Sequence, residues 1–245
     1  MTSQTGPNAK RRGALSRERV LRAALVLADK SGIESLSMRN LGQELGVEAM
    51  SLYNHVASKD DLLDGLVDLV LGEIEVAAIG SDWKPAMRRR AISAREVLSR
   101  HPWAAGLIES RTRPGPATLR YHDSVLGILR KAGFSVEMAA HAFSLLDSFI
   151  FGFGVQETSM PIGAAGDQAK VADAFLRRLR DDEFPYLAEM TEHAKKTSYD
   201  HSDEFEFGLD LILDGLEKAS DVAPRALKRK AGAPRSRRPT GKRPS

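Results

Sequence analysis

The sequence contains no cysteine among its 245 residues, which excludes disulfide bonds and thiolate metal ligands. It has no uninterrupted run of about 18 apolar residues, the length that a membrane-spanning helix needs. Its first residues, MTSQTGPNAKRRG, contain no apolar run after the basic ones, so we expect no secretory signal. We therefore expect a cytoplasmic protein with no membrane partner.

The motifs of several enzyme classes are also missing. The chain has no GxGxxG or GxxxxGK(S/T) phosphate-binding loop, no GxSxG nucleophile turn and no HExxH zinc motif. Its six histidines lack the close spacing of metal ligands, so we predict neither a metal nor a cofactor. The sequence therefore disfavours an enzyme, and we predict no catalytic residue.

The net charge of +3 is distributed unevenly. Residues 1–15 form a polar arm that contains Lys10, Arg11 and Arg12, and residues 222–245 carry nine Lys or Arg and no acid. Basic tails commonly contact polyanions, nucleic acid first, although a solvated tail that aids solubility is about equally consistent. We expect both segments to be disordered, because they have too few apolar residues to pack.

Between the tails, apolar residues recur at helical spacing and no alternation of period two indicates a strand, so we predict an all-α fold. Ser16, Ser37 and Ser58 are suited to cap three helices, and a further short helix is expected from Ala49 to His55. Later helices are expected near residues 83–100, 117–132, 135–157, 167–180 and 203–219.

Residues 41–66, LGQELGVEAMSLYNHVASKDDLLDGL, contain two short helical segments joined by a turn at Gly46. This pattern is typical of a helix-turn-helix, whose second helix can enter the major groove of DNA. Leu52 and Val56 lie one turn apart and should face the core. An ordinary helical hairpin would share these features, so the pattern alone leaves both interpretations open.

Residues 16–79 also resemble the DNA-binding domain of the tetracycline repressor family of bacterial transcription regulators. The matching run is GIESLSMRNLGQELGVEAMSLYNHVASKDDLLDGL, and LYNHVASKDDLL carries the family's Leu-Tyr-x-His/Tyr-Phe/Val-x-x-Lys pattern. The resemblance implies a homodimer that binds a near-palindromic operator in double-stranded DNA and is released by a small-molecule effector. Activation instead of repression is left open.

The same resemblance implies a domain order. We expect a helix-turn-helix domain at 16–60, a connecting helix at 61–80 and a helical effector-binding and dimerisation domain at 81–221. The helices near 135–157 and 203–219 would form the subunit interface.

Carried over position by position, the resemblance also implies the DNA contacts. Arg39 matches a residue that reaches a guanine, although a solvated or phosphate-bound arginine is an alternative. His55 could instead be structural. Ala49, Met50 and Asn54 differ from the tetracycline repressor's own residues, so the operator should differ as well. The candidate DNA-binding residues are Arg39, Ala49, Met50, Ser51, Tyr53, Asn54, His55 and Lys59.

The effector is less constrained. Glu75 stands where the tetracycline repressor has a histidine that helps to hold the drug, so we do not expect tetracycline. We expect an apolar molecule with one or two polar groups. The candidate pocket residues, each of which could instead belong to the core, are Trp103, Tyr121, His122, Phe143, Phe149 and Gln156.

A rival interpretation is a nucleoid-type protein that binds DNA without sequence preference through its basic tails. Six basic and six acidic side chains cancel in residues 16–60, so charge alone would not predict DNA binding by that segment. The two interpretations predict different results for Arg39. If DNA binding depends on the tails alone, replacing Arg39 should leave the affinity unchanged.

Overall fold

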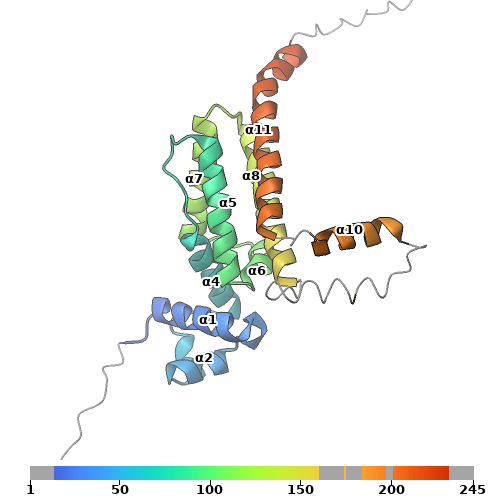
Figure 1. The fold of residues 1–245 in the computed structure, drawn as a ribbon. Helices are drawn as coiled ribbons and strands as arrows, with labels where there is room; N and C mark the ends of the chain where they lie inside the picture. The colour runs from blue at the N-terminus through green and yellow to red at the C-terminus, as the bar shows by residue number, and fades with distance from the viewer. Residues whose placement is uncertain (1–13, 160–173, 175–183, 197–200, 232–245) are drawn as a thin grey trace, which may run out of the picture. The chain divides into compact units, whose positions relative to one another are not determined.

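The computed structural model describes residues 14–159, 174, 184–196 and 201–231, and these residues form helices without any strand (Figure 1). The predicted all-α fold is confirmed. The described helices are α1 (Arg17–Ser31), the short 3-10 helix η1 (Ile33–Ser35), α2 (Met38–Leu45), α3 (Ala49–Leu52), α4 (Lys59–Glu73), α5 (Trp83–Arg100), α6 (Ala104–Ser110), α7 (Pro116–Lys131), α8 (Val136–Ser159), α10 (Pro185–Lys196) and α11 (His201–Ala231).

Three serines begin the helices of the N-terminal region as predicted. The hydroxyl oxygens of Ser16, Ser37 and Ser58 each accept a hydrogen bond of 3.1 to 3.2 Å from the backbone N–H three residues later. Gly46 ends α2 in the left-handed conformation, with φ of 68°, which a residue without a Cβ adopts most easily. Local side-chain chemistry therefore sets where these helices begin and end.

Two helices are shorter than predicted. α3 ends at Leu52 and not at His55, because the N–H groups of His55 and Val56 both donate to the Leu52 carbonyl and tighten the chain into a turn. α4 ends at Glu73 and does not fill residues 61–80. Ile74 takes extended backbone that buries its side chain, and the Glu75 N–H donates to Ser93 Oγ at 2.9 Å.

The C-terminal half also differs from the expectation. α6 and α10 were not predicted as separate helices, and the helix predicted at 167–180 lies outside the described residues apart from residue 174. α11 continues to Ala231, so the first part of the segment 222–245 is helical and not disordered. Residues 225–231, which follow Pro224 in this helix, are only Ala, Leu, Lys and Arg, and these are good helix formers.

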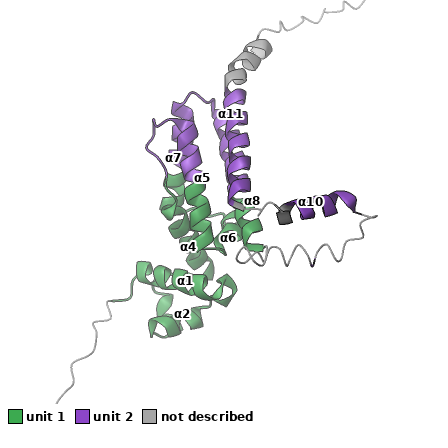
Figure 2. Cartoon of the chain, viewed as in Figure 1, with its two compact units in different colours: residues 1–75, 92–122, 151–161 green, residues 76–91, 123–150, 162–245 purple. Residues whose placement is uncertain are grey.

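The chain divides into two compact units that are interleaved along the sequence (Figure 2). The first contains residues 1–75, 92–122 and 151–161, and the second contains residues 76–91, 123–150 and 162–245. The predicted domains are consecutive ranges and remain predictions, because α5, α7 and α8 each contribute residues to both units.

The first unit is built around an aliphatic core under the short helices. Leu52 is fully buried and Val56 is 1% exposed, so the prediction that both face the core is confirmed. Each side chain removed from water contributes roughly 1.5 to 3 kcal/mol. The buried members of this core are Val20, Leu21, Ala24, Leu36, Leu41, Leu45, Leu52, Val56, Leu62 and Leu66.

The second unit packs its core around α8 and α11. The ring of Phe149 stacks on the buried ring of Phe205, with centroids 5.3 Å apart, and Trp83 meets Phe134 edge to face at 4.9 Å. Further out, Lys84 pairs with Asp214 and Glu217, which joins α5 to α11. Other buried residues of this core are Ala139, Ala142, Leu146, Ile150, Leu209, Leu213 and Leu216.

Among the residues that the structure describes, α8 is long and apolar enough to cross a membrane by length and composition. Asp147 near its middle, however, accepts a hydrogen bond from the Arg90 guanidinium of α5 within the folded chain. Arg90 is only 1% exposed, and a charge buried to that extent needs a countercharge.

We expect Asp147→Asn to lower the free energy of unfolding by about 3 kcal/mol, because the buried Arg90 loses the charge that offsets its desolvation. Urea denaturation followed by circular dichroism would measure this. The double variant Arg90→Met with Asp147→Leu should recover most of the loss, since it removes both charges. A single variant as stable as the parent protein would contradict the argument.

Candidate DNA-binding interface

α2 and α3 approach each other so closely that the contact requires a glycine. A Cβ added to Gly42 would lie 2.9 Å from the Val47 carbonyl oxygen and 3.2 Å from the Ala49 nitrogen, both backbone atoms. The Val47 N–H donates to the Gly42 carbonyl at 2.9 Å and closes the turn. Together with α1 as a brace, this is the helix-turn-helix arrangement that the sequence predicts.

The candidate DNA-binding residues lie on the solvent side of this motif. Arg39, Met50, Tyr53, Asn54 and Lys59 are exposed. The remaining candidates, Ala49, Ser51 and His55, are half-buried. The structure therefore brings the residues from α3 to the start of α4 together on one short stretch of chain, with Arg39 on the preceding helix.

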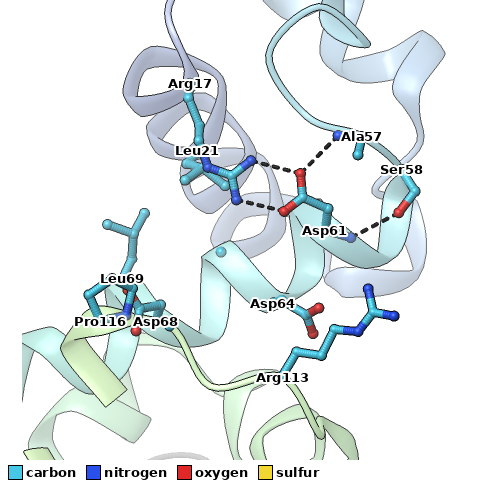
Figure 3. A pocket seen from close by; sticks show the side chains of 12 residues that line it. Arg17, Leu21, Ala57, Ser58, Asp61, Asp64, Asp68, Leu69, Arg113 and Pro116 are labelled. Atoms are coloured by element: carbon cyan, nitrogen blue, oxygen red, sulfur yellow. Dashed lines mark hydrogen bonds and ion pairs between the residues drawn. The ribbon is translucent and has the colours of Figure 1, made fainter. Parts of the chain in front are cut away.

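The turn between α3 and α4 is fastened to α1 by one arginine (Figure 3). The guanidinium of Arg17 donates to both carboxylate oxygens of Asp61 at 2.7 Å, and also to the His55 carbonyl at 3.2 Å. Asp61 in turn accepts the Ala57 N–H at 2.8 Å. Two side chains thus hold both ends of the turn that follows α3.

This pairing changes the protonation of both partners. Hydrogen bonding from Arg17 is the largest influence on Asp61 and lowers its pKa, against burial, which would raise it. The Ala57 N–H and the nearby charge of Arg113 act in the same direction as Arg17. The pKa of Arg17 is raised by its hydrogen bond to Asp61. Both groups therefore stay charged at neutral pH.

Another face of α4 carries carboxylates that hold a segment distant in sequence. Asp64 accepts from Arg111 Nε at 2.6 Å, and Asp60 pairs with the same guanidinium at 3.1 Å. One turn further, Asp68 accepts the Thr118 N–H at 2.7 Å and the Thr118 hydroxyl at 2.9 Å. α4 is therefore tied to the start of α7 and the loop before it.

A cavity of about 410 Å³ lies between these contacts, and Figure 3 shows its walls. Arg17 and Leu21 of α1 form one side, and Gly115 and Pro116 form the other. Its carboxylates already accept hydrogen bonds from neighbouring groups of the protein. We therefore assign it no ligand.

The end of α1 is joined to α4 and to the residues between α5 and α6 by a further polar cluster. Asp29 Oδ1 lies 2.7 Å from His101 Nδ1 and accepts the Trp103 indole N–H at 2.8 Å. His101 Nε2 lies 3.3 Å from Glu73, which also accepts from Arg100 at 2.8 Å. Burial is the largest single influence on Glu73 and would raise its pKa, but the contacts with Arg100 and His101 together lower it.

No group of three or more His, Cys, Asp or Glu side chains that could hold a metal occurs in the part of the chain that the structure describes.

Comparison with known proteins identifies this arrangement. Residues 20–66 match the family model of bacterial regulatory proteins of the tetR family. Residues 78–220, more than half of the chain, match the tetracyclin repressor-like, C-terminal domain. The chain belongs to the tetracycline repressor family. As a member it is a DNA-binding transcriptional repressor, as predicted, and its named relatives are regulators and not enzymes.

Relatives with known names support this over most of the chain. The HTH-type transcriptional repressor DrrR1 of Streptomyces coeruleorubidus is 32% identical over 214 residues, which cover 83% of this chain and 77% of DrrR1. The class D tetracycline repressor protein of Escherichia coli is 31% identical over 206 residues, 83% of this chain and 89% of that protein. The structure of the Streptomyces coelicolor protein ActR in complex with actinorhodin matches with a TM-score of 0.72 at 32% identity, covering 85% and 99% of the two chains.

In this tetracycline repressor family member, the candidate effector residues are spread over both units. Trp103, Tyr121, His122 and Gln156 belong to the first unit, and Phe143 and Phe149 belong to the second. Trp103 donates to Asp29 and Phe149 stacks on Phe205, so both have structural contacts. Tyr121 is buried and its ring lies 5.5 Å from that of His122, whereas Gln156 is exposed.

The residues that position this repressor's recognition helix are not indicated by any local sequence pattern. Arg17 and Asp61 are 44 positions apart, and Arg111 lies 47 positions from Asp64. A charged residue in a helix's first turn is ordinary, so no local pattern distinguishes Arg17 from a solvated arginine. The one available signal was the capping position of Asp61, three residues after Ser58.

We expect Asp61→Asn to lower the free energy of unfolding by about 1 kcal/mol at neutral pH, because the pair is partly exposed and screened. The folded-state pKa of Asp61 is lowered, so its contribution is complete above the ordinary carboxyl pKa and is lost as pH falls through the lowered value. Urea unfolding of both proteins across this range should show the difference shrinking in acid.

The exposed Glu44 supplies the control, because Glu44→Gln removes a carboxylate from α2 away from this pair. A difference between Asp61→Asn and the parent protein that stays constant with pH would contradict an ion pair as its source.

Proposed function

We propose that the protein is a cytoplasmic repressor that binds a near-palindromic operator in double-stranded DNA as a homodimer and is released by a small-molecule effector. The observation that carries this proposal is the orientation of α3. Leu52 and Val56 anchor it in the core, while Met50, Tyr53 and Asn54 face solvent. A helix held in this way presents a fixed set of side chains to a major groove.

The proposed DNA contacts are of two kinds, contacts to bases and contacts to phosphates. Arg39, exposed on α2, carries the fork that matches the two acceptors of a guanine edge. Tyr53 and Lys59 suit the phosphate backbone. Lys59 is also the first residue of α4, at the positive end of its helix dipole. Ser51 and His55 complete the set, within reach of either bases or phosphates.

Ligand-bound structures of a related protein support the proposal of a small-molecule effector. ActR has been crystallised with actinorhodin and with (S)-DNPA. For this chain we propose an apolar effector with one or two polar groups, for which Tyr121 and His122 are the best placed of the candidates, because their rings already lie together. A ligand that prefers one state of the dimer weakens DNA binding by its difference in affinity between the states.

The homodimer proposal is supported by apolar side chains that α8 and α11 leave exposed. Phe207 is 64% exposed and Leu211 is 59% exposed on α11, and Leu145 is 47% exposed on α8. Their neighbours Phe205 and Leu209 are buried. Both helices therefore have a second apolar side in addition to the one that packs within the chain.

We expect the double variant Phe207→Asp with Leu211→Asp to sediment as a monomer at micromolar concentration, because four charges would enter the subunit interface. Sedimentation velocity measures this. Leu119→Asp, which adds a charge at an equally exposed leucine of α7, is the control and should leave the dimer intact. Dimers formed equally by all three proteins would exclude this face of α11 as the interface.

We expect Arg39→Ala to abolish selection of a guanine in each half-site when bound duplexes are selected from a random library at physiological salt. The loss should be roughly 5- to 150-fold in affinity per half-site, since one bidentate arginine–guanine contact discriminates by roughly 1 to 3 kcal/mol. Arg120→Ala, which removes an exposed arginine of α7, should select the same sequence as the parent protein.

Diffuse enrichment that Arg39→Ala retains would instead mean that the basic tails bind DNA without sequence preference. Deletion of residues 224–245 distinguishes this case, because it would then reduce both the affinity and its dependence on salt.

A further inference from the structure

The recognition segment has an unusual chemical composition. Residues 49–55 are Ala, Met, Ser, Leu, Tyr, Asn and His, and none of them is a lysine or an arginine. The commonest specific contact in the major groove, an arginine or lysine on a guanine, is therefore not available to α3 itself. Its sequence preference must come from other contacts.

The most exposed apolar side chain of this segment lies at the centre of its outward face. Residues two apart in a helix point about 200° from each other, so Met50 points away from the buried Leu52. Ser51 and Tyr53 flank it at about 100° on either side of Leu52. The exposed fraction of Met50, 75%, agrees with this geometry.

Contacts within the protein fix the direction in which Met50 points before any DNA is bound. Leu52 and Val56 set the roll of α3 about its axis, and the Gly42 contact sets its distance from α2. Arg17 donates a hydrogen bond to the His55 carbonyl in the turn that follows α3. A methionine side chain on this fixed backbone remains adaptable, because it is unbranched and polarisable.

The major groove presents one apolar group, the C5-methyl of thymine. We infer that Met50 is a specificity-determining residue that packs on a thymine methyl at the centre of each operator half-site. This inference rests on the proposed function. It assigns the base pair that Met50 contacts as A·T, with the guanine contact left to Arg39 on α2.

The test uses the operator selected from the random library. Each thymine of a half-site is replaced in turn by uracil, which removes the methyl group and keeps every hydrogen-bonding group. Dissociation constants are then measured by fluorescence anisotropy. One substitution should weaken binding by the parent protein roughly fourfold per half-site, the value of one buried methyl group.

Variants at the same position connect this effect to Met50. Met50→Ala should bind the thymine and uracil operators equally, and Met50→Leu should restore the preference for thymine. Met50 is exposed, so both variants should fold, and circular dichroism verifies this. Arg39→Ala is the matched control, and it should keep the preference for thymine while losing the guanine.

Three outcomes are distinguishable from the expected one. If no thymine is sensitive to uracil, or if Met50→Ala keeps the sensitivity, the inference is wrong while an Arg39-dependent palindrome leaves the proposed function standing. If no palindrome is selected at all, the proposed function fails and this inference fails with it.

Discussion

The geometry of the DNA-binding surface depends on the pairing of Arg17 with Asp61. α3 has four residues, far fewer than an isolated helix needs to form in water. Its start is held by the close contact with α2, and the turn after it is held by Arg17 and Asp61 through the His55 carbonyl and the Ala57 N–H. A short recognition helix is possible here because α1 and α4 supply the order that α3 lacks.

α4 is the element that connects this surface to the remainder of the first unit. Asp60, Asp64 and Asp68 are spaced four residues apart and so lie along one face, where they hold Arg111 and Thr118. The adjacent Asp61 faces α1. A displacement of residues 111–118 would therefore pull on the same helix that begins at Lys59, and ion pairs and hydrogen bonds with short, directional geometry would transmit it.

How far the sequence predicts this structure depends on the range of each interaction. Serine caps, a terminating glycine and apolar periodicity act within one or two turns, so the starts of α1, α2 and α4 and the burial of Leu52 were predictable. The early end of α3 was not, because it results from turn hydrogen bonds that compete with helix continuation. The contacts of Arg17 and Arg111 span more than 40 residues and have no local signature.

Two of the basic side chains of the helix-turn-helix are paired with carboxylates of the protein. Arg17 is paired with Asp61, and Arg22 is paired with Glu18 at 2.7 Å, so neither contributes its full charge to the attraction of phosphates. Residues 16–60 are neutral in sum. A module of this kind gains little from counterion release, which supplies most of the affinity of strongly basic DNA-binding domains. Directional contacts from Arg39 and close packing at Met50 must then carry a larger share of operator recognition, and they distinguish sequences where phosphate contacts do not.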